Sequence, residues 1–161
     1  MTSADKPACI MLKASSEAAN ISLLSEALHA LCLYASGSVA CALDMQRAVV
    51  EALNNVVEHA YGNQPDHDIS VCWYLENRQL RIEIIDCGQS MSFLPEPVLP
   101  DFDAEGGRGW WIINACVNDY DYKVIDSVNR EYVLRPGDRN DNIRSASIEA
   151  HSNILTLIKQ F

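Results

Sequence analysis

The sequence AVVEALNNVVEHAYG, at residues 48–62, has the pattern of an amphipathic helix with a polar stripe. Its polar residues Glu51, Asn55 and His59 are spaced four apart. Four residues advance an α-helix by about 40° beyond one full turn, so the three side chains share one stripe over about 12 Å of helix. The apolar residues between them would face the core of the protein.

A carboxylate and a carboxamide on successive helical turns suit two kinds of chemistry. Oxygen atoms of Glu51 and Asn55 can bind a hard cation, directly or through water. The carboxylate of Glu51 can also act as a general base. The alternative is that this stripe is only the solvated face of an amphipathic helix.

Apolar periodicity on both sides of this helix predicts strands and helices in a recognisable order. The predicted elements are a strand at 8–14, helices at 17–34 and 39–60, strands at 68–76 and 80–85, a helix at 110–117, strands at 120–126 and 131–135, and a helix at 147–161. This order favours an α+β fold, a two-layer α/β sandwich with helices on one face of a mixed, largely antiparallel sheet. The predicted domain covers residues 1–136, and residues 137–161 form a C-terminal extension that we expect to be helical.

A second motif, Asp86-Cys87-Gly88, comes directly after the predicted strand at 80–85. An aspartate at a strand end can accept a hydrogen bond from an amino group, such as the exocyclic amine of a nucleobase. A glycine two residues later lets a ligand approach the backbone closely. The alternative is an Asp-x-Gly turn that merely ends the strand.

A third motif, Gly106-Gly107-Arg108-Gly109, follows a proline-rich and acidic loop at 89–106. Long loops in compact domains are usually functional or disordered. Glycines that open a helix free its first N–H groups to meet phosphate, and Arg108 could contact a phosphate oxygen. The alternative is a flexible connection between loop and helix. The motif lacks the Lys-Ser/Thr ending of a Walker A loop.

Charge and composition exclude several classes of function. The chain has 161 residues with 12 basic and 22 acidic side chains, which give a net charge of −10. Neutralising nucleic-acid phosphates or anionic lipids needs clustered Lys and Arg, so we expect neither direct nucleic-acid binding nor membrane binding. The six cysteines include no C-x-x-C pair, which argues against a zinc ribbon. With no predicted signal peptide or membrane helix, we expect a cytoplasmic protein.

The three motifs in this order resemble the ATPases typified by gyrase, MutL and histidine kinases. Within that group the chain is most similar to the stand-alone anti-sigma-factor serine kinases. The resemblance covers roughly residues 8–135, and its matching stretches are AVVEALNNVVEHAYG at 48–62, IIDCGQSM at 84–91 and EGGRGWWIINACVNDYDY at 105–122. It implies the Bergerat-type ATP-binding fold.

The resemblance also implies roles for single residues. Asn55 would bind the Mg²⁺ ion that bridges the phosphates of ATP, and Glu51 would be the general base that activates the attacking hydroxyl. Asp86 would accept a hydrogen bond from the adenine amine, and Gly88 would leave room beside the ring.

The glycine-rich motif would serve the phosphates. Gly107 and Gly109 would let the loop and the helix start wrap around them, with Arg108 as a further phosphate contact. His59 and Tyr61 match the same subgroup, and we interpret them as helix-end packing or partner contacts.

The implied activity is that of an ATP- and Mg²⁺-dependent protein serine/threonine kinase. Such a protein binds a sigma factor in one state and phosphorylates an anti-anti-sigma (STAS-type) protein in another. The resemblance also suggests a homodimer. Two alternatives remain at this point: a nucleotide-sensing binding module with little catalysis, and a kinase of the same type whose output protein is not a sigma factor.

Overall fold

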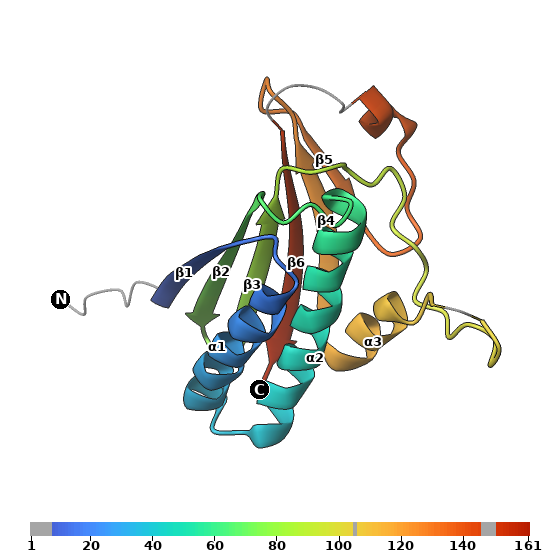
Figure 1. Ribbon diagram of the computed structural model, residues 1–161. Helices are drawn as coiled ribbons and strands as arrows, with labels where there is room; N and C mark the ends of the chain where they lie inside the picture. Colours follow the sequence, from blue (N-terminus) through green and yellow to red (C-terminus); the bar gives the residue numbers. More distant parts are fainter. Residues whose placement is uncertain (1–7, 105, 146–150) are drawn as a thin grey trace.

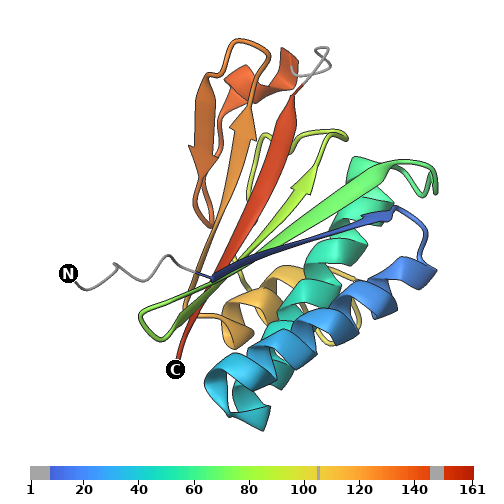
Figure 2. The same ribbon diagram turned by 90° about the vertical axis from the view of Figure 1, so that its left-hand side faces the viewer.

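The computed structural model describes residues 8–104, 106–145 and 151–161. In these residues a six-stranded sheet has the order β1-β2-β3-β6-β4-β5, and each of its pairings is antiparallel. The helices cover one face of this sheet (Figure 2). The elements are β1 (Ala8–Ser15), α1 (Ala19–Ser36), α2 (Val39–Asn55), η1 (Val56–Ala60), β2 (Asp68–Glu76), β3 (Gln79–Asp86), α3 (Gly109–Cys116), β4 (Asp119–Ile125), β5 (Glu131–Leu134), η2 (Asp141–Ser145) and β6 (Ser152–Gln160). The predicted α+β two-layer sandwich is confirmed, with a sheet that is antiparallel throughout these strands rather than mixed.

The core lies between the sheet and the paired helices α1 and α2 (Figure 1). Strand β3 shows why its sequence forms one wall of this core, since Leu80, Ile82 and Ile84 are buried while the residues between them are more exposed. Helix α2 supplies the opposite wall through fully buried residues such as Met45 and Leu53. Within the described part of the chain, no helix is long and apolar enough to cross a membrane.

Helix α2 begins at a side-chain cap, and at its C-terminal end it continues into a π-helix. The hydroxyl of Ser38 accepts a hydrogen bond from the backbone N–H of Cys41, which satisfies a free donor at the helix start. After Asn55 the backbone continues as the π-helix η1, a wider turn that is often found at functional sites. The wider turn therefore begins at the point where the polar stripe passes from Asn55 to His59.

The prediction of a C-terminal helix at 147–161 is wrong for residues 152–160, which form β6. His151 and Phe161 are not helical either, and residues 147–150 lie outside the described residues. Leu155 and Leu157 face the core, with a period of two that matches a strand. The helix was predicted from the spacing of the apolar residues Ile148, Leu155, Ile158 and Phe161. Because β6 pairs with both β3 and β4, the sheet continues past the predicted boundary at 136.

The long loop after β3 is anchored at its beginning. The backbone N–H of Leu94 donates to the carbonyl of Asp138 at 3.0 Å, and the N–H of Gly137 donates to the carbonyl of Leu94 at 2.7 Å. Leu94 is fully buried, whereas Phe102, later in the loop, is 98% exposed. The first part of the loop is therefore held by the connection between β5 and β6, and its later part projects into solvent.

Candidate functional site

The three sequence motifs converge on one cavity of about 1110 Å³. Its walls come from α2 and η1, the end of β3 and the start of α3, with the beginning of the long loop along one side. Helix α3 lies beside α2 on the helical face of the sheet (Figure 1). Every predicted site residue except Gly88 lines this cavity: Glu51, Asn55, Asp86, Gly107, Arg108 and Gly109.

Glu51 presents its carboxylate to the start of α3. A Cβ atom placed on Gly109 would lie 3.0 Å from Oε2 of Glu51, so the two helices meet at this point because residue 109 has no side chain. Partial burial of Glu51, together with the nearby carboxylate of Glu58, raises the pKa of Glu51. A raised pKa strengthens a carboxylate as a proton acceptor, which suits a general base.

Asn55 has unused hydrogen-bonding capacity. Its Nδ2 atom is buried and has no hydrogen-bond partner among the described residues. A buried amide without a partner is costly, and such groups commonly meet a ligand, an ion or water. Among the described residues no group of three or more His, Cys, Asp and Glu side chains could hold a metal ion. A cation would bind the amide oxygen of Asn55, whereas Nδ2 can only donate to a ligand or water. The cation would complete its shell with water and ligand oxygens, as Mg²⁺ does in phosphate sites.

Asp86 is a buried carboxylate at the end of β3, with 5% of its surface exposed. Its Oδ1 accepts hydrogen bonds from Nδ2 of Asn153 at 2.8 Å and from the backbone N–H of Gly88 at 2.9 Å. Burial raises the pKa of Asp86, while these two hydrogen bonds and the nearby His151 oppose that rise. Both hydrogen bonds fix one carboxylate oxygen, which orients the group without using Oδ2.

Asn153 is a site residue that the sequence analysis missed. It is fully buried on β6, and besides Asp86 its Nδ2 donates to the carbonyl of Gly88 at 3.0 Å. Its Oδ1 accepts a hydrogen bond from the hydroxyl of Ser90 at 2.5 Å. The helical interpretation of the C-terminal segment concealed it. The sequence signal that could have identified it is an asparagine in line with the inward apolar residues of an alternating strand.

The structure shows why residue 88 is a glycine, and this reason differs from the expected one, room for a ligand. A Cβ atom at this position would lie 2.4 Å from the carbonyl oxygen of Ala60, a distance that no side chain tolerates. The next residue, Gln89, donates its backbone N–H to the same oxygen at 2.9 Å. The glycine therefore lets the turn after β3 pack directly on the end of η1.

The glycine-rich motif has a backbone conformation that residues with side chains rarely adopt. Gly106 and Gly107 have φ angles of +83° and +79°, a region that only glycine adopts without strain. Arg108 precedes α3 and is exposed, and its side chain does not cap the helix. The first N–H groups of α3 and the guanidinium thus remain available on the cavity wall.

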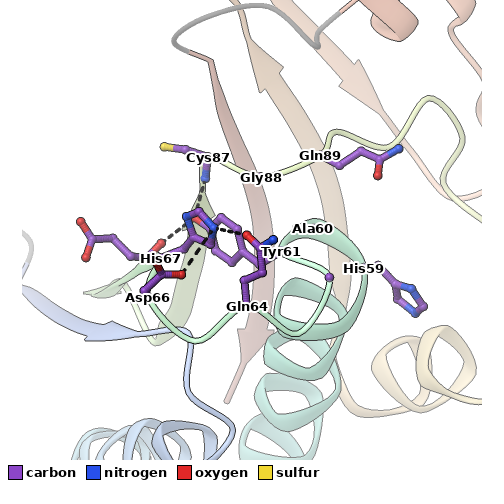
Figure 3. A pocket seen from close by; sticks show the side chains of 11 residues that line it. His59, Ala60, Tyr61, Gln64, Asp66, His67, Cys87, Gly88 and Gln89 are labelled. Carbon is purple, nitrogen blue, oxygen red and sulfur yellow. Dashed lines mark hydrogen bonds and ion pairs between the residues drawn. The ribbon is translucent and has the colours of Figure 1, made fainter.

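A second cavity, of about 600 Å³, adjoins the first and shares His59, Ala60 and Gln89 with it. Figure 3 shows Tyr61 and His67 beside Cys87 in this cavity, with His59 on the other side of the helix end. The aromatic rings of Tyr61 and His67 stack with centroids 4.6 Å apart. Tyr61 is therefore a buried packing residue, as one of the two interpretations expected, whereas His59 is exposed and lines both cavities.

Comparison with known proteins identifies a match over most of the chain. A family model described as a histidine kinase-like ATPase domain matches residues 14–135. No curated protein matches the chain. The matched span contains the predicted site residues from Glu51 to Gly109 and ends before β6, so Asn153 lies outside it.

Proposed function

The chain belongs to the family of histidine kinase-like ATPase domains, and we propose that it is a protein serine/threonine kinase that uses Mg²⁺ and ATP and acts as an anti-sigma factor. The family supports ATP binding. The observation that carries the proposal is the meeting of a general-base candidate, a carboxamide, a buried aspartate and a glycine-opened helix in one cavity.

Each wall of the cavity suits one part of ATP. Asp86 offers a fixed carboxylate to the amine of adenine at the end of β3. Gly107 and Arg108, at the start of α3, offer N–H groups and positive charge to the phosphates. Asn55 lines the same cavity and would hold Mg²⁺, whose chemistry here is to offset phosphate charge.

Glu51 is the residue that separates a kinase from a passive nucleotide-binding module. In the proposed reaction its carboxylate takes the proton of the acceptor hydroxyl as that oxygen forms a bond to the γ-phosphorus of ATP. The bond between that phosphorus and the bridging β–γ oxygen breaks, and ADP leaves. The raised pKa of Glu51 favours this proton transfer.

The proposed partners follow from the resemblance to anti-sigma-factor kinases. We propose an anti-anti-sigma (STAS-type) protein as the phosphate acceptor, a sigma factor as the protein captured in the other state, and a homodimer as the assembly. The net charge of −10 suits partners with basic surfaces, because complementary charge speeds encounter.

The test is transfer of label from γ-labelled ATP to a purified STAS-domain protein encoded beside this chain. We expect the wild type to label a serine or threonine of that protein and Glu51→Gln to lose at least about a hundredfold in rate. Glu17→Gln, which removes an exposed carboxylate before α1, is the matched control and should label normally. ATP binding without any labelling by the wild type would instead support a nucleotide-sensing module. Labelling without sigma-factor capture would support a kinase with another output.

A further inference from the structure

Tyr61 connects three elements through a single hydroxyl group. Its Oη donates a hydrogen bond to the carbonyl of Asp68 at 2.7 Å and accepts one from the backbone N–H of Cys87 at 2.9 Å. Asp68 begins β2 and Cys87 follows the last residue of β3, so both lie at the same end of this antiparallel strand pair. The hydroxyl therefore ties the end of the site helix to the strand end that carries Asp86 (Figure 3).

The surroundings of Tyr61 keep this hydroxyl in place and protonated. The side chain is 7% exposed, and its ring stacks on His67 with an interplanar angle of 9°. Burial raises the pKa of Tyr61 to about 12. The hydroxyl thus keeps its proton over the whole neutral range and continues to donate to Asp68.

The backbone after Asp86 has little freedom on the side that faces the helix. A Cβ atom at Gly88 would lie 2.9 Å from Cδ1 of Tyr61, which shows how closely the turn packs on this ring. The N–H of Gly88 in turn donates to Oδ1 of Asp86. A shift of this turn would therefore move a hydrogen bond that orients the Asp86 carboxylate.

From this arrangement we propose that Tyr61 is a positioning residue for nucleobase selection. Its hydroxyl holds the Cys87 N–H, the turn at 87–89 keeps its place, and Asp86 faces the adenine amine in a fixed orientation. This inference rests on the proposed function, because it concerns the base end of the same ATP cavity. Tyr61 itself does not line that cavity and acts only through the turn.

The variant Tyr61→Phe removes one oxygen atom and keeps the ring that stacks on His67. It leaves the Cys87 N–H and the Asp68 carbonyl without their present partner. Losing such a bond commonly corresponds to about a tenfold change in an equilibrium constant. We expect ATP to bind about tenfold more weakly, and its preference over GTP to fall by a similar factor.

The experiment is calorimetric titration of the full chain with Mg-ATP, Mg-GTP and magnesium tripolyphosphate, which has no base. Tyr120→Phe is the matched control, because the Tyr120 hydroxyl is buried without a hydrogen-bond partner among the described residues. In Tyr61→Phe only ATP should bind more weakly, and GTP and tripolyphosphate should bind as to the wild type. The control should bind all three ligands as the wild type does.

Unchanged ATP affinity in Tyr61→Phe would overturn this inference alone, as would an equal loss for ATP and tripolyphosphate. A wild type that binds no ATP would overturn the proposed function and this inference with it. Should Tyr61→Phe fail to fold, amide hydrogen exchange of the wild type gives the answer. Slow exchange at Cys87 that ATP slows further supports the inference, and exchange at the rate of an open loop refutes it.

Discussion

Nδ2 of Asn153 lies 2.8 Å from Oδ1 of Asp86 and thereby joins the last strand of the sheet to the base end of the cavity. The two residues are 67 positions apart in the chain, and both are buried. The same carboxamide also contacts Gly88 and Ser90. One side chain of β6 thus holds Asp86, Gly88 and Ser90 at the end of β3 and in the turn that follows it.

We predict that Asn153→Leu destabilises the protein and weakens ATP binding. The change removes the hydrogen bonds from Asn153 to Asp86 and to the Gly88 carbonyl and leaves them only the Gly88 N–H and His151, so we expect a loss of about 1–3 kcal/mol. Urea unfolding measures the stability loss, and calorimetric titration measures the affinity. Ser90→Ala, which removes only the hydroxyl that donates to Asn153, should cost less. Equal losses for both variants would show that Asn153 does not orient Asp86.

The raised pKa of Asp86 should make the stability of the protein depend on pH. Its pKa in the folded protein is raised above the ordinary value of 3.8, chiefly because it is buried. The folded state then holds this proton more tightly than the unfolded state, so the free energy of unfolding falls as pH rises through the range above 3.8. We predict that Asp86→Asn removes this fall. Urea unfolding of both proteins at a series of pH values measures it, and parallel curves would contradict the prediction.

Two glycines of the site should respond differently to alanine. Gly88→Ala would place a Cβ atom 2.4 Å from the backbone oxygen of Ala60, which cannot yield easily, so we expect a loss of about 1–3 kcal/mol or more. Gly109→Ala would meet only the flexible end of Glu51, at 3.0 Å, and alanine favours a helix start over glycine. We therefore predict near wild-type stability but slower phosphate transfer for Gly109→Ala. Thermal unfolding and labelling assays separate the two effects.

Most of the fold and of the candidate site could be predicted from local sequence patterns. The spacing of Glu51 and Asn55 depends only on helix geometry, and Asp86 follows an alternating strand that needs no distant information. β6 was different, because Ile154 and Ile158 on its outer face are apolar too, which obscures its period of two. Its identity depends on pairing with β3 and β4, which no local pattern reports. The role of Asn153 was hidden for the same reason.

Because β6 pairs with β3 and β4, the end of the chain should be essential for folding. We predict that a chain ending at residue 150 lacks the cooperative unfolding transition of the full protein, since it loses strand partners on both sides and buried Leu155 and Leu157. Circular dichroism during thermal unfolding measures this. A truncated chain with a sharp transition would show that the sheet closes without β6.

The pH dependence of catalysis should depend on Glu51 and its neighbour Glu58. A general base must be ionised, so the rate of phosphate transfer should fall as pH decreases through a range above the ordinary Glu pKa of 4.5. The carboxylate of Glu58 contributes to the raised pKa of Glu51, after the larger effect of burial. Glu58→Gln should therefore move the acidic limb of the rate profile to lower pH. Single-turnover labelling at saturating ATP measures that limb in both proteins, with Glu17→Gln as the control for a lost surface charge. A limb that stays in place in Glu58→Gln, or moves equally in Glu17→Gln, would show that Glu51 is not the group that titrates.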